Sequence, residues 1–469
     1  MNVHLDEKLV ENITYDELSI GDGAQIVRTL TVNDIKAFAA VSGDTNPAHL
    51  DPSYADQTLF HGVIAHGMWG GALISSVLGN HFPGAGTIYL DQTLHFKKPI
   101  RIGDTLTIQV TVISKDDTKK KVELNCSIQN QSGELVLDGV AKVLAPTEKI
   151  MRKAINPAEI CLFEPQERLS NLLALGKNLP PIATAVVHPC DVDSLSGAIQ
   201  AGMSGLIRPI LIGPLGKISH IAKENNIDLS GVEIIDVPHS HAAAAKASQM
   251  AGDRQVEAIM KGSLHTDELM HEVIANPALR TGRRLSHVFR IDTPMYAKPL
   301  LLTDAAINIF PSLEEKADII QNAIDFAKIM GVDIPKVAIL SAVETITPKI
   351  PSTVDAAALC KMAQRGQIKG GIIDGPLAFD NAISREAAII KNIESTVSGD
   401  PDILMAPDLE SANMLAKQLE YLGGATAAGI VLGAKVPIAL TSRADGPSAR
   451  MASALLAKMI AHHNRKLSN

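Results

Sequence analysis

The pattern of apolar and polar residues divides the 469-residue chain into two parts. Residues 31–42 have the spacing of a helix capped by Thr31 or Asn33. Trp69 to Leu78 is an almost uncharged run that is apolar on all sides, which predicts a buried helix. Farther along, apolar and polar residues alternate, as they do in half-buried strands. One buried helix wrapped by a strongly curved antiparallel sheet predicts an α+β domain over residues 15–145.

A second pattern begins near residue 182, where short apolar segments alternate with amphipathic helical ones. The first apolar segments are residues 184–189, 208–214, 232–238 and 258–264. Such alternation predicts a mostly parallel sheet with helices on both faces. We therefore expect an α/β domain over residues 181–467. The intervening residues 146–180 are rich in proline and predict a linker with one modest helix.

The overall charge and apolar content exclude several classes of partner. A formal net charge of −8 and a pI near 6.0 argue against nucleic acid. The longest basic run, Lys119 to Lys121, falls in an expected hairpin and predicts a solvated edge. No run approaches the roughly 20 uncharged apolar residues of a membrane span. Because the N-terminus also lacks the apolar core of a signal sequence, we expect a cytoplasmic protein.

The cysteines and histidines do not form a metal-binding pattern. The four cysteines are far apart and include no C-x-x-C pair; they are Cys126, Cys161, Cys190 and Cys360. They predict free thiols in a reducing compartment rather than a zinc site or a disulfide framework. We expect no metal site.

The stretch from Val41 to Trp69 holds the densest set of reactive side chains. Asn46-Pro47 interrupts any helix, because the residue before proline avoids the α region. The resulting turn allows Asp44 and His49 to approach each other. A carboxylate and an imidazole that share one water molecule can remove and return its protons. The amide of Gly67, which begins the expected buried helix, can stabilise an enolate oxygen.

This stretch resembles the (R)-specific enoyl-CoA hydratases, the MaoC-like hot-dog family. The family signature is Asp-x-Asn-Pro-x-His followed by His-Gly-Met, and both parts are intact at residues 44–49 and 66–68. The resemblance continues through residues 86–112 and covers nearly all of residues 15–145.

The hydratase resemblance implies a role for each matching residue. Asp44 and His49 would activate water, and the Gly67 amide would polarise the thioester. Asn46 and Ser75 match supporting polar positions at the substrate. The implied substrate is an acyl-CoA thioester.

Polar residues follow several expected strands of the second domain. Ligands of open α/β sheets bind beyond the carboxyl ends of the strands. The residues at these ends are Lys261, Asp374, Asp380, Asn413, Ser442, Arg443 and Asp445. A cluster of Arg280, Arg283 and Arg284 precedes another strand, and the planar guanidinium fork suits phosphate or CoA oxygens. Neither a G-x-G-x-x-G after the first strand nor a Walker motif is present, so we expect no nucleotide cofactor.

These segments resemble the phosphate acetyl/butyryltransferase family, whose architecture is similar to that of isocitrate dehydrogenase. The matching segments are MKGSLHTDEL, RRLSHVF, DGPLAFDNAIS, APDLESANMLAKQL and PIALTSRAD. Their order matches that of the family, and they cover about residues 180–465. The implied reaction converts acyl-CoA and orthophosphate into acyl phosphate and CoA.

The transferase resemblance also assigns roles. Ser442 and Arg443 would lie at the reaction centre, with Arg284 or Arg283 helping Arg443 to bind phosphate or the thioester oxygen. The nearest candidate for the base is Asp445, because Ala449 occupies the position where acetyl-type members carry an aspartate. This departure leaves the base open, or favours the butyryl-type branch. Lys261, Asp374, Asp380 and Asn413 are the further substrate-binding candidates.

The sequence therefore predicts a bifunctional enzyme of acyl-CoA metabolism that forms a homo-oligomer and needs no cofactor beyond its substrates. Three alternatives remain open. The hot-dog domain could only bind acyl-CoA, beside an active transferase. The second domain could belong to the structurally related NAD(P)-dependent dehydrogenases. The whole chain could be a non-enzymatic acyl-CoA-binding assembly factor.

Overall fold

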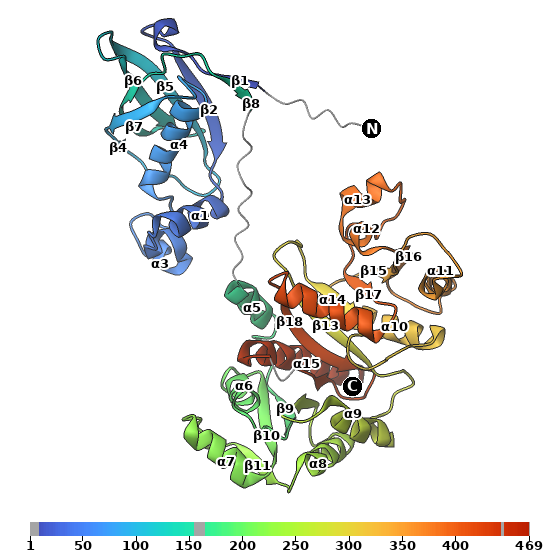
Figure 1. Ribbon diagram of the computed structural model, residues 1–469. Helices are drawn as coiled ribbons and strands as arrows, with labels where there is room; N and C mark the ends of the chain where they lie inside the picture. The colour runs from blue at the N-terminus through green and yellow to red at the C-terminus, as the bar shows by residue number, and fades with distance from the viewer. Residues whose placement is uncertain (1–8, 154–164, 442–444, 469) are drawn as a thin grey trace. The chain divides into compact units, whose positions relative to one another are not determined.

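The structure, a computed structural model, describes residues 9–153, 165–441 and 445–468. The chain divides into two compact units, residues 1–162 and 163–469, here called the N-terminal and C-terminal units (Figure 1). This division falls inside the segment that was expected to be a linker. That segment also holds the short strand β8 (Met151–Lys153) and the helix α5 (Pro165–Ala174), which matches the single helix expected there.

The N-terminal unit combines short helices with an antiparallel sheet. Its strands are β1 (Leu9–Glu11), β2 (Gly23–Thr29), β3 (Ile88–Gln92), β4 (His95–Phe96), β5 (Thr105–Asp116), β6 (Lys121–Gln129), β7 (Leu135–Leu144) and β8 (Met151–Lys153). Its helices are η1 (Tyr15–Glu17), α1 (Val32–Ser42), α2 (Pro47–Leu50), α3 (Pro52–Asp56) and α4 (Gly67–Asn80). Thr31 caps α1, as expected, and forms a capping box with Asp34.

The sheet of the N-terminal unit has the order β2-β5-β6-β7-β3, and β4 pairs with β7. Residues alternate along the strands because successive side chains point to opposite faces. Leu106, Ile108 and Val110 of β5 are fully buried, whereas the intervening residues keep some exposure. This pattern confirms the alternation expected from the sequence, and the strands curve around α4 (Figure 1).

Helix α4 is the central helix of the unit, but it is buried on one face only. Trp69, Ile74 and Val77 pack into the core formed with the sheet. Met68 is 59% exposed, and Ser75 is also exposed. The expectation of a helix buried on all sides was therefore wrong. An uncharged sequence shows that a helix can be buried, but only the packing decides how much of its surface is covered.

The C-terminal unit alternates strands and helices. Its strands are β9 (Ile182–Val187), β10 (Ile207–Gly213), β11 (Glu233–Asp236), β12 (Ala258–Lys261), β13 (Ser286–Asp292), β14 (Leu300–Thr303), β15 (Lys336–Leu340), β16 (Ile372–Leu377), β17 (Ile403–Met405), β18 (Thr426–Leu432) and β19 (Ile438–Ala439). The helices that connect them are α6 (Val192–Met203), α7 (Leu215–Glu224), α8 (Ser240–Gly252), α9 (Thr266–Ala275), η2 (Pro277–Leu279), α10 (Leu313–Ile329), α11 (Pro351–Gln364), α12 (Phe379–Ile383), α13 (Arg385–Ile390), α14 (Leu409–Tyr421) and α15 (Pro447–Ser468).

These strands form one mixed, largely parallel sheet in the order β11-β10-β9-β12-β19-β18-β13-β14-β17-β15-β16. Strands β11, β10, β9, β12 and β19 are mutually parallel. In the middle of the sheet, β18 is antiparallel to β19, β13 to β18, and β14 to β13. Strands β14, β17, β15 and β16 are again parallel to one another, but they run opposite to β19.

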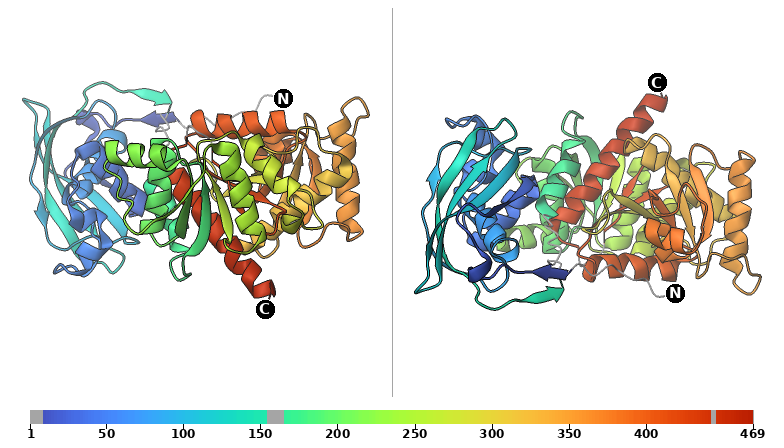
Figure 2. Two further views of the ribbon diagram at one scale, coloured as in Figure 1. Left: turned by 90° about the horizontal axis from the view of Figure 1, so that it is seen from below. Right: turned by 90° about the horizontal axis from the view of Figure 1, so that it is seen from above.

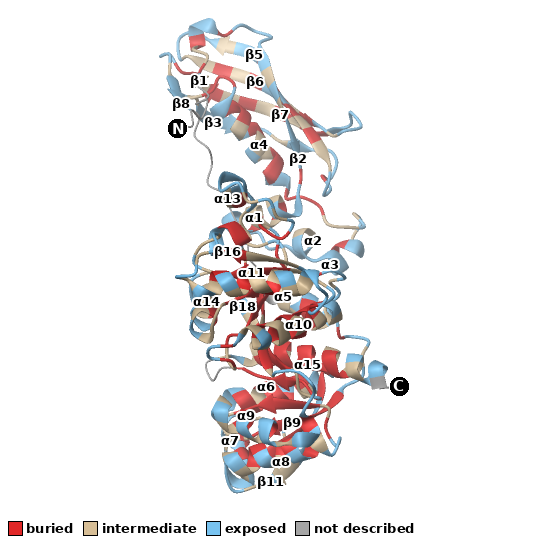
Figure 3. Cartoon of the chain, turned by 90° about the vertical axis from the view of Figure 1, so that its right-hand side faces the viewer, coloured by how far each residue is buried: buried red, intermediate tan, exposed pale blue. Residues whose placement is uncertain are grey.

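Helices cover both faces of this sheet, as expected from the near-continuous apolar strands. Along β9, Ile182 and Val186 belong to one core, whereas Ala185 and Val187 belong to another. Helix α15 crosses the sheet and packs against α6, β18 and β19 (Figure 2). Figure 3 shows buried residues concentrated on β9 and α15. Within the described ranges, no helix combines the length and apolar character that crossing a bilayer requires.

Candidate active sites

The local fold between α1 and α2 brings the polar residues of the N-terminal unit together. Gly43 ends α1 with φ of 75°, a conformation that glycine adopts without strain. Asn46 caps α2 by accepting a hydrogen bond from the Ala48 amide, and Pro47 begins that helix. A carboxylate oxygen of Asp44 and ring nitrogens of His49 and His66 consequently lie within 4.8 Å of one another. The turn expected from Asn46-Pro47 therefore produces the expected approach.

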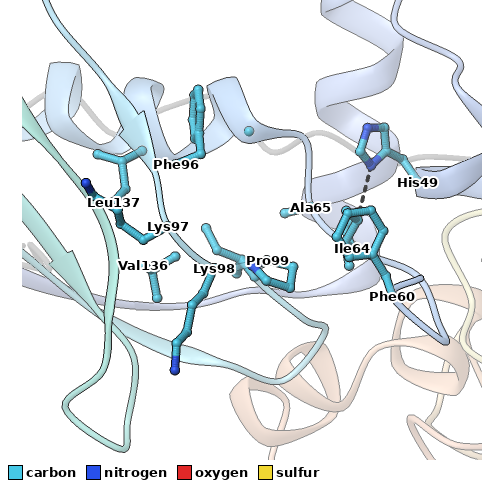
Figure 4. Close-up of a pocket in the computed structure, with 12 residues that line it drawn as sticks. His49, Phe60, Ile64, Ala65, Phe96, Lys97, Lys98, Pro99, Val136 and Leu137 are labelled. Carbon is cyan, nitrogen blue, oxygen red and sulfur yellow. Dashed lines mark hydrogen bonds between the residues drawn. The ribbon is translucent and has the colours of Figure 1, made fainter. Parts of the chain in front are cut away.

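The His49 ring is oriented by a backbone carbonyl. Its Nδ1 lies 2.8 Å from the carbonyl oxygen of Ile64, which can only accept a hydrogen bond (Figure 4). The proton of a neutral ring is therefore at Nδ1, and Nε2 keeps its lone pair. A ring held in this tautomer can accept a proton from water through Nε2.

A pocket of about 290 Å³ opens beside His49 and Gly67. Its lining is largely apolar and includes Phe96, Pro99 and Leu137 (Figure 4). The amide of Gly67 has no partner four residues earlier in a helix, because Gly67 is the first residue of α4. A Cβ at this position would lie 3.1 Å from the Phe96 ring, so any larger residue would require that ring to shift. The arrangement suits a thioester whose acyl chain enters an apolar pocket.

The two supporting positions of this site have different surroundings. The Asn46 side chain is used as the cap of α2. Ser75 lies exposed on α4, two turns after Gly67. The motif residues Asp44, His49 and Gly67 thus converge, whereas the Asn46 side chain accepts the capping hydrogen bond of α2.

In the C-terminal unit, two buried cations converge at the carboxyl ends of β12 and β19. Lys261 ends β12, is 4% exposed, and donates through Nζ to the carbonyl oxygen of Thr441 at 3.4 Å. Arg450, which is 1% exposed, donates through Nη1 to the Thr441 hydroxyl at 2.8 Å. Thr441 directly precedes the predicted Ser442 and Arg443, which lie outside the described residues. Sequence analysis missed both Arg450 and the contact between Lys261 and Thr441.

Carboxylates lie near Arg450. Burial lowers the pKa of the Arg450 guanidinium, and the nearby carboxylates of Asp191 and Asp445 oppose this effect. Burial also opposes ionisation of Asp191, but hydrogen bonds from Ser194 and Ser263 bring the pKa of this carboxyl below its ordinary value. The edge formed by β9, β12 and β19 therefore holds fixed charges of both signs.

Asp445 lines a neighbouring pocket of about 300 Å³. The buried ion pair between Arg290 and Asp292, at the end of β13, lines the same pocket. Glu420 and Ala449 contribute further to its wall. The predicted base is therefore beside a cavity, and the pair on β13 is a second feature that the sequence did not indicate.

The predicted arginines lie at the opposite end of the sheet. Arg284 and Arg283 precede β13, whose amino end neighbours the carboxyl end of β18. They line a pocket of about 390 Å³, and both are held by carboxylates. Arg284 pairs with Glu315 at 3.0 Å, and Arg283 pairs with Asp325.

The other predicted residues also belong to this opposite end or its surroundings. Asp374 was expected to follow a strand. It lies within β16 instead, where it accepts a hydrogen bond from the Gly375 amide. Asp380 pairs with Lys391 at 2.9 Å, and this hydrogen-bonded cation lowers the pKa of the Asp380 carboxyl. Asn413 donates to the carbonyl oxygen of Ala305 at 3.1 Å and so ties α14 to the segment after β14.

One buried carboxyl at this end escaped the sequence analysis. Asp304 is 3% exposed and accepts hydrogen bonds from the amides of Ala306 and Ile307. Burial raises the pKa of its carboxyl. Its only signal in the sequence is its place directly after the apolar strand β14, a criterion that many surface residues also meet.

Comparisons with known proteins assign both units. The family described as "Phosphate acetyl/butaryl transferase" matches residues 240–458, and the family described as "MaoC like domain" matches residues 22–131. A phosphate acetyltransferase of Rhizobium meliloti is 58% identical over 299 residues, which is 64% of this chain and 95% of that protein.

Two solved structures are also similar. A branched-chain phosphotransacylase from Enterococcus faecalis V583 is 29% identical, with a TM-score of 0.53, over 60% of this chain and 99% of that one. The R-hydratase PhaJ1 from Pseudomonas aeruginosa is 42% identical, with a TM-score of 0.32, over 33% of this chain and 100% of that one. The resemblance to phosphate transferases is thereby confirmed in preference to the dehydrogenase alternative. The family match and the 58% identity over 95% of a phosphate acetyltransferase show that the chain belongs to the phosphate acetyl/butyryltransferase family, and it carries a MaoC-like domain at residues 22–131.

Proposed function

We propose that the C-terminal unit transfers an acetyl group between CoA and orthophosphate. The observation that carries this proposal is the 58% identity to a phosphate acetyltransferase over 95% of that protein's length. The branched-chain phosphotransacylase shares only 29% identity, which favours acetyl over a branched acyl group. The proposed activity thus rests on the similarity to phosphate acetyltransferases, and the site residues indicate how the reaction would be catalysed.

In the proposed reaction, an oxygen of orthophosphate attacks the carbonyl carbon of acetyl-CoA. The carbon–sulfur bond breaks, and the products are acetyl phosphate and the CoA thiolate, which takes up a proton. Lys261 and Arg450 provide fixed positive charge near the anionic reactants, and such charge is worth more in a buried site than in water. Ser442 and Arg443 remain the proposed reaction centre, with Asp445 as the group that exchanges the thiol proton.

Release of free thiol from acetyl-CoA and from butyryl-CoA, with and without orthophosphate, tests this proposal on the whole protein. We expect phosphate-dependent release that is faster with acetyl-CoA. Faster release from butyryl-CoA would move the chain to the butyryl-type branch. Absence of release with either substrate would contradict the transferase proposal.

We propose a second activity for the N-terminal unit, the reversible hydration of trans-2-enoyl-CoA to (R)-3-hydroxyacyl-CoA. The specific observation in its favour is the convergence of Asp44 and His49 beside the pocket at the start of α4. The dyad would remove one proton from water as its oxygen bonds to C3, and return one proton to C2. The Gly67 amide would donate to the thioester oxygen, on which negative charge develops in the enolate.

Hydration of trans-2-butenoyl-CoA, followed as loss of the enoyl absorbance, tests the second activity. We expect (R)-3-hydroxybutanoyl-CoA as the product. If the wild-type protein binds the enoyl-CoA without hydrating it, the N-terminal unit is an acyl-CoA-binding domain instead.

The two proposed reactions share CoA thioesters but are not consecutive, because an enoyl reduction would normally lie between them. A cytoplasmic location, a homo-oligomeric state and the absence of a further cofactor belong to this proposal as well.

A further inference from the structure

His66 opens the His-Gly-Met motif and has no role in the proposed hydration. Its side chain is only 2% exposed, whereas its neighbours Ala65 and Gly67 line the pocket. The His66 ring lies between two others: its centroid is 4.0 Å from that of His49, with an interplanar angle of 34°, and 5.1 Å from that of Phe38. The ring therefore packs directly against the catalytic imidazole.

The same ring also holds the loop that carries Asp44. Its Nε2 lies 3.0 Å from the backbone carbonyl oxygen of Asp44. A carbonyl oxygen can only accept, so Nε2 carries the proton and Nδ1 of the neutral ring does not. The contact joins residues 22 positions apart in the chain. It thus fixes the Asp44 loop to the N-cap of α4.

The second ring nitrogen shows that the bond to Asp44 is the reason for a histidine here. Nδ1 of His66 is buried and has no hydrogen-bond partner among the described residues. A buried polar atom without a partner is unfavourable, so an apolar ring would fill the same space between Phe38 and His49 more favourably. What histidine adds over phenylalanine is the donation from Nε2.

His66 contacts all three parts of the proposed hydratase site. Its ring packs on His49, its Nε2 holds the Asp44 carbonyl, and its backbone is the N-cap of α4, directly before Gly67. We propose that His66 is a positioning residue that sets the separation of the Asp44 carboxylate, the His49 ring and the Gly67 amide. The inference rests on the proposed hydratase function. Because the His66 side chain is 2% exposed and is not among the residues that line the pocket, it acts through these groups rather than on the substrate.

Three substitutions of His66 distinguish the packing of its ring on His49 from its hydrogen bond to the Asp44 carbonyl. His66→Ala removes the ring and the donor. His66→Phe keeps a ring against His49 but loses the donor, and His66→Gln keeps an amide near the position of Nε2 but loses the ring. His81→Gln is the matched control, because His81 is an exposed histidine at the other end of α4. The kcat and KM for trans-2-butenoyl-CoA are measured for each variant of the whole protein, and thermal unfolding followed by Trp69 fluorescence checks that the unit folds.

We expect His66→Ala to lower kcat by about 100-fold, because a misplacement of about 1 Å costs a factor of this size. The KM should change much less, because no contact with the substrate is removed. His66→Phe and His66→Gln should each recover part of kcat, and His81→Gln should match the wild type. If His66→Ala does not fold, the comparison of the Phe and Gln variants with the wild type decides the question.

Two results would overturn the inference. One is a wild-type kcat in folded His66→Ala, or in both partial variants if the Ala variant does not fold. The other is a raised KM with unchanged kcat, which would make His66 a substrate-binding residue. A wild-type protein that shows no hydration at all would instead refute the proposed hydratase function, and that failure is visible before any variant is made.

Discussion

The proposed hydratase site comes from the single stretch between Asp44 and Gly67, whereas the proposed transferase site joins residues that are far apart in the chain. In the N-terminal unit, one turn and two helix starts suffice to bring Asp44, His49 and Gly67 together. In the C-terminal unit, the contact between Lys261 and Thr441 spans 180 residues. It depends on β12 and β19 being parallel neighbours.

The buried histidines of the two units also differ in the hydrogen bonds of their rings. His66 of the N-terminal unit is 2% exposed and makes one hydrogen bond, to the Asp44 carbonyl. His287 on β13 of the C-terminal unit is fully buried, and neither of its ring nitrogens has a partner among the described residues. The comparison shows that a buried histidine can connect parts of a site, or it can be a core residue that makes stability depend on pH.

The largest effect that separates the two sites should come from Asp44→Asn. This change removes the carboxylate of the acid–base pair but keeps the size of the side chain. We expect the rate of enoyl-CoA hydration to fall by roughly 10²–10⁴-fold, the usual contribution of general acid–base catalysis. Acetyl phosphate formation by the same preparation should be unchanged. Equal losses of both activities would mean that the units do not function separately.

Lys261→Met should give the next largest effect, and it should lower the transferase activity while leaving enoyl-CoA hydration unchanged. It keeps the length of the buried side chain but removes its charge and its hydrogen bond to Thr441. A hydrogen bond that involves a charged group contributes about 1.5–3 kcal/mol, so the transferase kcat/KM should fall roughly 10- to 100-fold. The control is Lys223→Met on the exposed side of α7. If the Lys261→Met variant kept the wild-type transferase kcat/KM, Lys261 would not belong to the transferase site.

The C-terminal unit should also lose stability at acidic pH through His287. Burial lowers the pKa of this imidazole to about 3. The unfolded chain takes up a proton near pH 6.5 while the folded chain does not, so the free energy of unfolding falls as the pH drops below about 6.5. The loss should reach up to about 1.4 kcal/mol per pH unit.

Urea unfolding of the wild type and of His287→Leu, followed by circular dichroism at several pH values, isolates this contribution. All other titrating groups are shared, so the difference in slope belongs to His287. The variant should show the flatter dependence on pH, whatever its absolute stability. Parallel curves for the two proteins would be the contrary result.

The smallest effects should come from matched helix caps, one in each unit. Thr31 is the N-cap of α1 and Ser312 is the N-cap of α10, and each forms a capping box with the acidic residue three positions later. Replacing either by alanine should cost about 1 kcal/mol of stability in its own unit. Trp69 is the single tryptophan of the chain, so its fluorescence reports on the N-terminal unit alone. A shift of the Trp69 transition by Ser312→Ala would show that the two units unfold together.

The candidate residues of the N-terminal unit could be predicted because their geometry is local. Asn46-Pro47 forces a turn, and Gly67 starts a helix, whatever the rest of the chain does. The contact of the His66 ring with His49 and Asp44 could not be predicted in the same way. It depends on how α1, α2 and α4 pack, and the helical and strand periods of a sequence carry no information about such packing.

The C-terminal unit shows more clearly what the sequence could not predict. Its apolar strands and amphipathic helices could be predicted, and so could the mostly parallel sheet. The sequence did not indicate that β18, β13 and β14 reverse the strand direction in the middle of the sheet. Lys261 and Asp445 consequently lie at one end, whereas Arg283, Arg284 and Asn413 belong to the other.

By itself, the sequence determined the two units, the classes of their folds and the acid–base motif between Asp44 and Gly67, because apolar periodicity and turn residues act over a few neighbouring positions. Only the tertiary structure decided which strands are neighbours and in which direction they run. These choices depend on hydrogen bonds between segments far apart in the chain, and they place Lys261 and Arg450 on Thr441 and the His66 ring on His49.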